Sequence, residues 1–299
     1  MKTLKKLNYV FSKDNEVEAR VESGDIMVFN TVDCFANQVK DESHTMDKLD
    51  LNKANPTAGP VYVEDADPGD VIAVDILDIQ VEDQGFACSI PAVGPLADIS
   101  EMRTRMFHIE NEYVDFNGVT WKIDPMVGVI GLAPKEGKIA CGHLGKHGGN
   151  LDSKLIKKGS RVYLPVNHPG GLLQIGDLHA SMGDGEVSGT GIEVSGQVVA
   201  RVSLIKDFEL IWPVTETKDM WYVNAACDNF EESYMAASKE LARLMVDAYP
   251  LDQTDIFIYL SLQGDFGVNQ FVHPVDGESP SVRFGIPKNP AAKPLIRKK

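Results

Sequence analysis

Acidic and imidazole side chains crowd one glycine-rich segment, residues 176–193. Asp177 and His179 stand two positions apart, so in an extended strand both side chains would project from one face and could bind a cation together. Asp184 and Glu186 repeat this spacing after a glycine, and Glu193 follows. Because such closely spaced charges repel one another, the segment predicts a cation site or a shared proton. The alternative is an acidic surface loop.

A second segment, residues 142–152, carries His147, Asn150 and Asp152 among four glycines. Glycines next to His147 allow the backbone to turn sharply, which would bring the imidazole, the amide and the carboxylate toward one point. Loops of this kind often carry function. The alternative is a group of β-turns with its polar side chains in solvent.

Other chemical motifs do not fit the sequence. It contains no Gly-x-Gly-x-x-Gly fingerprint, phosphate loop, EF-hand loop, His-Glu-x-x-His helix or Gly-x-Ser-x-Gly elbow. The four cysteines stand far apart, which argues against both a disulfide framework and a Cys-x-x-Cys metal site. Cys141 lies two residues before His143, but residues this close on a strand rarely reach the geometry that activates a thiol nucleophile.

The elements that must position these groups are mostly strands. Up to about residue 215, short β-branched runs alternate with Gly, Pro, Asn and Asp. The clearest runs span residues 25–32, 61–64, 71–79, 161–166 and 194–205. Glycine-containing corners between short runs favour a barrel over a parallel sheet.

Helical patterning appears only near the end of the chain. Asn229 opens a capping-box pattern, and apolar residues then recur at helical period up to Tyr249. A second helix is expected after Asp252 and a short strand near Phe271. Residues 288–299 contain prolines and basic side chains, so we expect a solvated tail or an arm on a neighbouring molecule.

Length and composition fit one large domain or two intertwined ones: 299 residues, 43% hydrophobic and 24% charged. Lys and Arg number 29 against 44 Asp and Glu, and the net charge of −15 disfavours nucleic acid and membrane surfaces as partners. No apolar run approaches the roughly 18 residues that span a bilayer, and the first residues lack a signal-peptide core. A cytoplasmic protein is therefore expected.

The two chemical segments together resemble the acetamidase/formamidase family. The matching residues are 147–152 (HGGNLD), 164–166, 176–180 (GDLHA), 183–187 (GDGEV), 192–193, 59–63, 68–70 and 286–288. The resemblance implies hydrolysis of short aliphatic amides such as formamide and acetamide. It also implies a mainly β fold with an α/β part, in which a β-barrel and a β/α subdomain are interleaved within a single unit, 1–299. Residues 168–171 depart from the turn expected for the family, so the substrate preference is not carried over.

Amide hydrolysis needs a strong nucleophile, a stabilised oxyanion and a proton for the leaving nitrogen. A divalent cation could polarise the carbonyl and activate water. Under this hypothesis the metal ligands are Asp177, His179, His147 and Asp33, with Zn²⁺ the first choice because carboxylate and imidazole suit it, and Ca²⁺ the reserve. His44 could complete the site, although its simpler interpretation is a solvated loop residue.

Proton transfer needs a carboxylate beside the reacting atoms. Glu186 is the first choice for this general acid/base, with Asp152 and Glu193 as further catalytic candidates. Asn150 and Asp184 are the candidates for binding the substrate.

Two other functions stay open from the sequence. One is a metal-independent amidase that uses a carboxylate or thiol nucleophile helped by Lys146. The other is a non-catalytic protein that is stabilised by a cation and binds small polar ligands or forms part of a larger assembly. In each case a homo-oligomer, most simply a dimer, is expected from the acidic, β-rich chain with its extended ends.

Overall fold

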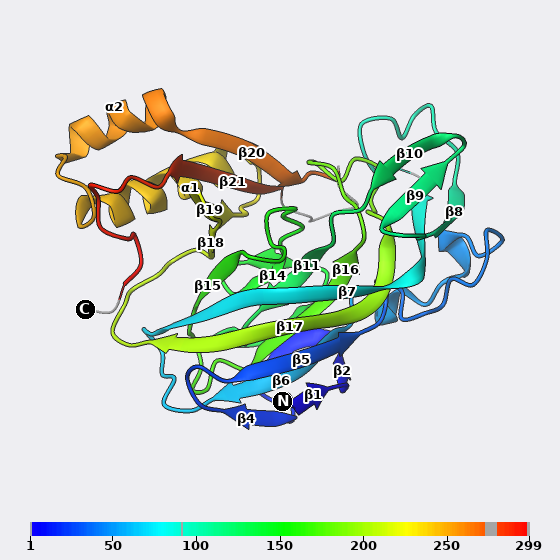
Figure 1. The fold of residues 1–299 in the computed structure, drawn as a ribbon, viewed down its shortest axis with the longest axis horizontal. Helices are drawn as coiled ribbons and strands as arrows, with labels where there is room; N and C mark the ends of the chain where they lie inside the picture. Colours follow the sequence, from blue (N-terminus) through cyan, green and yellow to red (C-terminus); the bar gives the residue numbers. More distant parts are fainter. Residues whose placement is uncertain (1, 91, 273–279, 298–299) are drawn as a thin grey trace.

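Short β-branched runs form strands along most of the chain. The computed structural model describes residues 2–90, 92–272 and 280–297 and contains, within them, 21 strands and two α-helices (Figure 1). The expectation of a mainly β fold is confirmed. Seventeen of these strands form one continuous hydrogen-bonded network that curls into a half-barrel.

One long sheet forms the front of this network. Its strands lie in the order β1 (Lys2–Leu4), β5 (Ile26–Thr31), β17 (Glu193–Ile205), β7 (Val71–Ser89), β15 (Arg161–Pro165), β18 (Val214–Glu216), β19 (Met220–Ala225), β21 (Ser281–Pro287) and β20 (Asp265–Gln270). All these pairs are antiparallel except β1 with β5. In Figure 1, β7 and β17 cross the molecule as its two longest ribbons.

A second layer lies behind the first. Its strands follow the order β4 (Ala19–Val21), β6 (Thr57–Val63), β16 (Leu173–His179), β11 (Met126–Gly131), β14 (Gly148–Asn150) and β13 (Leu144–Gly145), with β2 (Leu7–Asn8) also paired to β6. The layers join where the end of β16 pairs with the start of β17, with His179 opposite Glu193. Apolar side chains from both layers, such as Phe29, Ile130 and Val198, fill the space between them.

Smaller elements complete the first part of the chain. β8 (Arg103–His108) pairs with the far end of β7, and two separate ribbons are formed by β9 (Tyr113–Phe116) with β10 (Val119–Lys122) and by β3 (Val10–Ser12) with β12 (Lys138–Ala140). Two 3-10 turns, Met46–Lys48 and Leu51–Lys53, follow β5.

Both helices lie where the sequence predicts them. Asn229 accepts a hydrogen bond from the Glu232 amide at 2.9 Å and begins α1 (Phe230–Val246), and the Asp252 carboxylate caps α2 (Gln253–Gln263). The helices pack with β15, β18, β19 and β21 around a second apolar core. Because β15 and the start of β7 contribute side chains to this core, the barrel-like and β/α parts are interleaved, as expected.

Three sequence expectations need adjustment. The strand that begins at Val71 does not end at residue 79 but continues to Ser89, because β17 and then β8 supply hydrogen-bonding partners along its length. The strand expected near Phe271 is β20, which ends one residue earlier at Gln270. The solvated tail is wrong for Leu295 and Ile296, which are buried in the second core; residues 298–299 lie outside the described residues.

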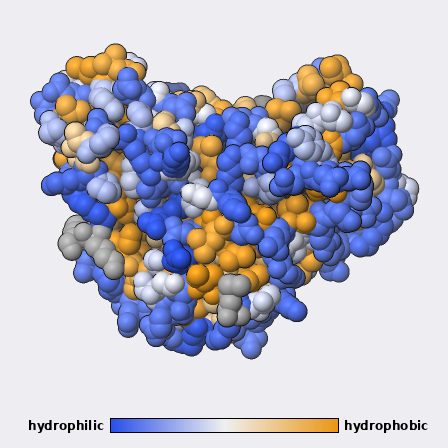
Figure 2. All heavy atoms as spheres, viewed as in Figure 1, coloured by the Kyte–Doolittle hydropathy of each residue, from blue (hydrophilic) through white to orange (hydrophobic). Residues whose placement is uncertain are grey.

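The molecule has two raised lobes with a saddle between them (Figure 2). Comparison with Figure 1 places α2 and β20 in one lobe and β8, β9 and β10 in the other. Within the described residues, neither helix has the length and apolar character needed to cross a bilayer.

Candidate active site

Five titratable side chains meet near the junction of β16 and β17. The Nε2 atom of His179 lies 3.2 Å from Glu193 Oε1, 3.5 Å from Asp177 Oδ1 and 3.9 Å from Glu186 Oε1. Asp152 is also buried and offers a ligand atom within 4.8 Å of those of His179 and Glu186. Four carboxyl groups thus surround one imidazole, out of contact with bulk solvent.

Strand register brings these residues together. β16 carries Asp177 and His179, and its antiparallel pairing with β17 places Glu193 directly opposite His179. Gly128 of β11 leaves room beside them, since a Cβ atom there would come within 2.6 Å of Asp152 Oδ1 and 2.8 Å of Asp177 Oδ2. A side chain at residue 128 would therefore displace the carboxylates.

Three of the four carboxylate residues have left-handed backbone conformations. The φ angle is +45° at Asp152, +56° at Asp177 and +47° at Glu186. Such angles are uncommon outside glycine, and they persist where the surrounding structure enforces them, often at functional sites. The spacing argument for Asp177 and His179 assumes a regular extended strand, and the φ angle of Asp177 departs from it. Both side chains still reach the same cluster.

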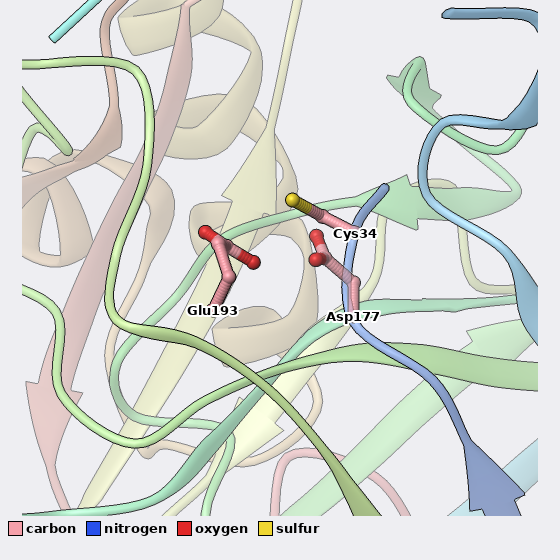
Figure 3. Close-up of side chains that lie close together, drawn as sticks. All are labelled: Cys34, Asp177 and Glu193. Atoms are coloured by element: carbon pink, nitrogen blue, oxygen red, sulfur yellow. The ribbon is translucent and has the colours of Figure 1, made fainter. Parts of the chain in front are cut away.

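Cys34 reaches the cluster although its sequence context gives no chemical signal. Figure 3 shows that the side chains of Cys34, Asp177 and Glu193 point toward one another, and their ligand atoms lie within 4.8 Å. Burial and the nearby Glu193 raise the pKa of the Cys34 thiol well above its usual value. Because nucleophilic attack requires a thiolate, this environment argues against Cys34 as the nucleophile.

Asn55 is a second residue that the sequence analysis missed. Its Nδ2 donates a 2.8 Å hydrogen bond to Asp177 Oδ2, while the Gly191 amide donates to Glu193 Oε1 at 2.9 Å. Asn55 lies far from residues 176–193 in the sequence and has no motif, so only the fold reveals it. These donors orient two of the carboxylates.

Burial and mutual repulsion dominate the electrostatics of the cluster. Burial, followed by the charge of Asp177, raises the pKa of Asp152 to about 8, and burial raises the pKa of Glu193 to about 7. The pKa of Glu186 also rises well above its usual value through burial and the neighbouring Asp152. Burial alone would lower the pKa of His179, but Glu193 and Asp177 reverse the effect and raise it well above 6.5.

His147 does not join this cluster. Its ring packs edge-on against Phe11 at 5.0 Å between centroids, and burial together with nearby His143 lowers its pKa to about 4. Among the described residues, neither group of clustered ligand atoms includes His147. Its Nε2 is buried and has no hydrogen-bond partner among the described residues, so the ligand role of His147 stays a prediction.

Two further residues that the sequence offers as ligands, Asp33 and His44, lie outside the two ligand groups found among the described residues, and Asn150 is a candidate for binding the substrate. Asp33 accepts hydrogen bonds from the Phe35 and Asn37 amides at 2.9 and 3.0 Å, and so shapes the turn that presents Cys34. Asn150 belongs to β14, and its buried Oδ1 has no hydrogen-bond partner among the described residues. His44 pairs instead with Asp41, at 3.3 Å.

Asp184 anchors the turn that carries Glu186. Its carboxylate accepts two 2.8 Å hydrogen bonds from the nearly buried Arg283 guanidinium and forms an ion pair with Lys154 at 2.9 Å. The Gly185 amide donates to Asn269 O at 2.9 Å. Because Arg283 lies on β21 and Asn269 on β20, the last two strands help to position Glu186. The contacts of the Asp184 carboxylate with Arg283 and Lys154 therefore hold this turn in place.

Cys141 belongs to neither ligand group among the described residues. Its thiol lies 3.4 Å from Thr57 Oγ1 in a small apolar cluster with Phe11 and Val129, and burial raises its pKa to about 12. A protonated, buried thiol does not support the cysteine mechanism considered from the sequence.

The cluster fits a divalent cation. Asp152 Oδ1 and Oδ2 and Glu193 Oε2 are buried and have no hydrogen-bond partner among the described residues. Asp177 Oδ1 also lacks a hydrogen bond, although His179 Nε2 lies 3.5 Å away. Carboxylate, imidazole and thiol groups form two possible ligand sets, Asp152/His179/Glu186 and Cys34/Asp177/Glu193. Buried charges are normally paired or coordinate metals, so the unpaired oxygens favour a bound cation.

A curled, mainly β fold thus surrounds one buried group of acidic and imidazole side chains, an arrangement that is typical of functional sites. The family model described as the acetamidase/formamidase family matches residues 5–141 and 138–236. The chain therefore belongs to the acetamidase/formamidase family.

Known relatives agree with this assignment. A formamidase from Methylophilus methylotrophus is 30% identical in an alignment 256 positions long, and the match covers 63% of this chain and 61% of that protein. The chain thus spans about three fifths of the length of the curated relatives it matches.

Solved structures match more completely. An acetamidase from Bacillus halodurans superposes with a TM-score of 0.91 and 36% identity, covering 96% of this chain and 97% of that one. A protein from Thermoanaerobacter tengcongensis, described as a predicted acetamidase/formamidase, gives 0.91 and 37%, covering 96% and 95%.

Proposed function

We propose that this protein hydrolyses short linear amides, such as formamide and acetamide, to a carboxylate and ammonia. The observation that carries the proposal is the buried cluster of four carboxyl groups around His179. Family membership and the names of the relatives support the same reaction. Environments that shift several pKa values in one place are typical of catalytic sites.

Glu186 is the proposed general acid/base, with Asp152 and Glu193 as its catalytic neighbours. Its side chain is 6% exposed, whereas those of His179, Asp177 and Glu193 are only 1–2% exposed, so Glu186 lies nearest to the approach of substrate and water. Its carboxylate would accept a proton from the attacking water and return it to the leaving nitrogen. The Arg283–Asp184 pair holds the turn that carries it.

Asp177 and His179 are the proposed metal ligands, and Glu193 can complete the set, because His179 Nε2 lies 3.5 Å from Asp177 Oδ1 and 3.2 Å from Glu193 Oε1. Cys34 shares a group of ligand atoms with Asp177 and Glu193 but not with His179. A bound divalent cation polarises a carbonyl and lowers the pKa of bound water. Nitrogen, oxygen and sulfur donors in one cluster favour Zn²⁺, with Ca²⁺ the alternative if only the carboxylates bind. Asn55 and the Gly191 amide orient Asp177 and Glu193 in either case.

The proposal predicts ammonia release from at least one of formamide, acetamide and propionamide by the purified, metal-replete protein. The buffer rate without protein serves as the baseline. Release above this baseline supports an amidase, whereas no release from any of the three contradicts the proposal and favours a non-catalytic binding protein. Release that survives exhaustive chelation would favour the metal-independent amidase.

We further propose that the interleaved parts, 1–299, act as one unit and that the protein forms a homodimer. Contacts of β20 and β21 with the Glu186 turn support the single unit.

The dimer is supported by α2, where the exposed Phe257, Ile258 and Leu262 offer an apolar surface for a second copy. Light scattering at micromolar concentration is expected to give twice the chain mass, and a monomer mass would refute the dimer. The cytoplasmic location stays a prediction from the sequence.

A further inference from the structure

A buried series of hydrogen bonds connects two segments of the active site through β20 and β21. The Ser281 hydroxyl donates to Leu151 O at 2.7 Å and accepts a 3.2 Å hydrogen bond from Asn269 Nδ2. The backbone of Asn269 extends the series, because its carbonyl accepts from the Gly185 amide at 2.9 Å. Asn269 and Ser281 are fully buried, so water does not compete for these hydrogen bonds. In Figure 1 their two strands lie side by side.

Each end of this series lies next to a carboxylate of the cluster. Leu151 directly precedes Asp152 in the sequence. Gly185 directly precedes Glu186, and its carbonyl also accepts a 3.0 Å hydrogen bond from the Phe271 amide. The φ angles of +45° at Asp152 and +47° at Glu186 belong to left-handed conformations, which persist where the surrounding structure enforces them. The hydrogen bonds at the preceding residues therefore help to hold both unusual conformations.

Asn269 occupies an irregular position in β20. Along the pairing of β20 with β21, Val268 lies opposite Val282. The next pair is Gln270 with Ser281, so β20 contains one additional residue, Asn269, where β21 contains none. Such a β-bulge redirects a side chain, and bulges are common next to active sites. Here the bulge brings the Asn269 amide to the Ser281 hydroxyl.

Both ends of the Asn269 amide have further partners. Its Oδ1 accepts a 3.0 Å hydrogen bond from Arg283, the residue that also binds the Asp184 carboxylate in the Glu186 turn. Its Nδ2 donates to Asn224 Oδ1 at 3.2 Å. A buried side chain with its hydrogen bonds satisfied makes its surroundings rigid. Asn269 is thus connected to the Glu186 turn both through its backbone and through Arg283.

We propose that Ser281 and Asn269 are positioning residues that fix the separation of two catalytic carboxylates. The inference rests on the proposed amidase function. The two carboxylates are those of Asp152 and Glu186, each of which offers an oxygen within 4.8 Å of the other and of a His179 nitrogen. Neither positioning residue belongs to a ligand group found among the described residues. Both act on the chemistry through the backbone that carries the carboxylates.

Ser281→Ala tests the proposal, because it removes the hydroxyl that connects the two segments. A misplacement of about 1 Å can cost about 10²-fold in rate, so kcat for ammonia release is expected to fall about 10–100-fold. KM is expected to stay nearly constant, since the displaced groups act in proton transfer. Ser160→Ala is the matched control: this buried hydroxyl also donates to a backbone carbonyl, Lys157 O, at 2.7 Å. It is expected to leave kcat and KM unchanged.

A combined variant separates positioning from a general loss of stability. Adding Ser281→Ala to Glu186→Gln is expected to cost little further turnover, because the effects of residues that act as a unit are strongly non-additive. If Ser281→Ala does not fold, as judged by circular dichroism, Ser281→Cys carries the same test. A thiol has a similar shape to the hydroxyl and is a weaker hydrogen-bond donor.

The outcomes separate this inference from the function on which it rests. No ammonia from any amide with the unchanged protein contradicts the amidase function and the inference with it. Turnover by the unchanged protein, with equal kcat in Ser281→Ala and Ser160→Ala, overturns the positioning inference alone. A full further loss in the combined variant also overturns it. A fall in kcat at nearly constant KM, absent from Ser160→Ala and not repeated in the combined variant, supports both.

Discussion

Replacing Glu186 by Gln is expected to lower kcat for amide hydrolysis by about 10²–10⁴. Glutamine keeps the size and shape of the side chain but cannot take up the proton of the attacking water. Ammonia assays at saturating amide measure the loss. Glu231→Gln, which makes the same change at an exposed position in the first turn of α1, is the control and is expected to leave kcat unchanged.

The same variant separates a catalytic from a structural role. Because burial raises the pKa of Glu186 in the folded state, the ionised carboxylate opposes folding at neutral pH. Removing its charge is therefore expected to maintain or raise the thermal midpoint of the metal-free protein while turnover is lost. Undiminished turnover in Glu186→Gln would remove Glu186 from the mechanism, and a lost fold would show a structural role instead.

Replacing His179 by Ala is expected to remove both the bound cation and the turnover. His179 is the only nitrogen ligand in the two ligand groups found among the described residues, and three carboxylates lie within 3.9 Å of its Nε2 atom. Loss of an outer partner of a metal ligand typically costs 10–100-fold in affinity or activity, so loss of the ligand itself is expected to cost at least about 10²-fold.

Elemental analysis and ammonia assays on the same sample check this prediction. His44→Ala is the matched control, because His44 pairs with Asp41 outside the cluster. It is expected to keep the cation content and kcat of the unchanged protein. Full cation content with undiminished turnover in His179→Ala would show that the site is misplaced.

Local spacing in the sequence predicts which side chains gather in the buried cluster. Asp177, His179, Glu186 and Glu193 lie within one segment, and the pairing of β16 with β17 needs only a short connection to bring the last of them opposite His179. The glycines at 148 and 149 indicate Asp152 as a candidate residue from the sequence. In these cases the residues that form the cluster lie close together in the sequence or beside glycines, so they can be recognised there.

The remaining contacts depend on pairings between distant segments. Cys34 and Asn55 reach the cluster because β5 pairs with β17 and β6 pairs with β16, and neither residue has a neighbouring motif. Arg283 of β21 donates a hydrogen bond to Asp184, which lies 99 positions earlier in the sequence. Conversely, His147 has the same glycine-framed pattern as Asp152, yet its ring packs edge-on against Phe11 of β3 and lies outside the two ligand groups found among the described residues. Sequence spacing alone does not distinguish these cases.

We propose that the buried cluster hydrolyses amides with the help of a bound cation. The most direct measurement is ammonia release by the unchanged protein, His179→Ala and Glu186→Gln, with bound metal per chain determined on the same samples. We expect metal and turnover in the unchanged protein, neither in His179→Ala, and metal without turnover in Glu186→Gln. Turnover that is equal in all three proteins, whatever their metal content, would contradict it.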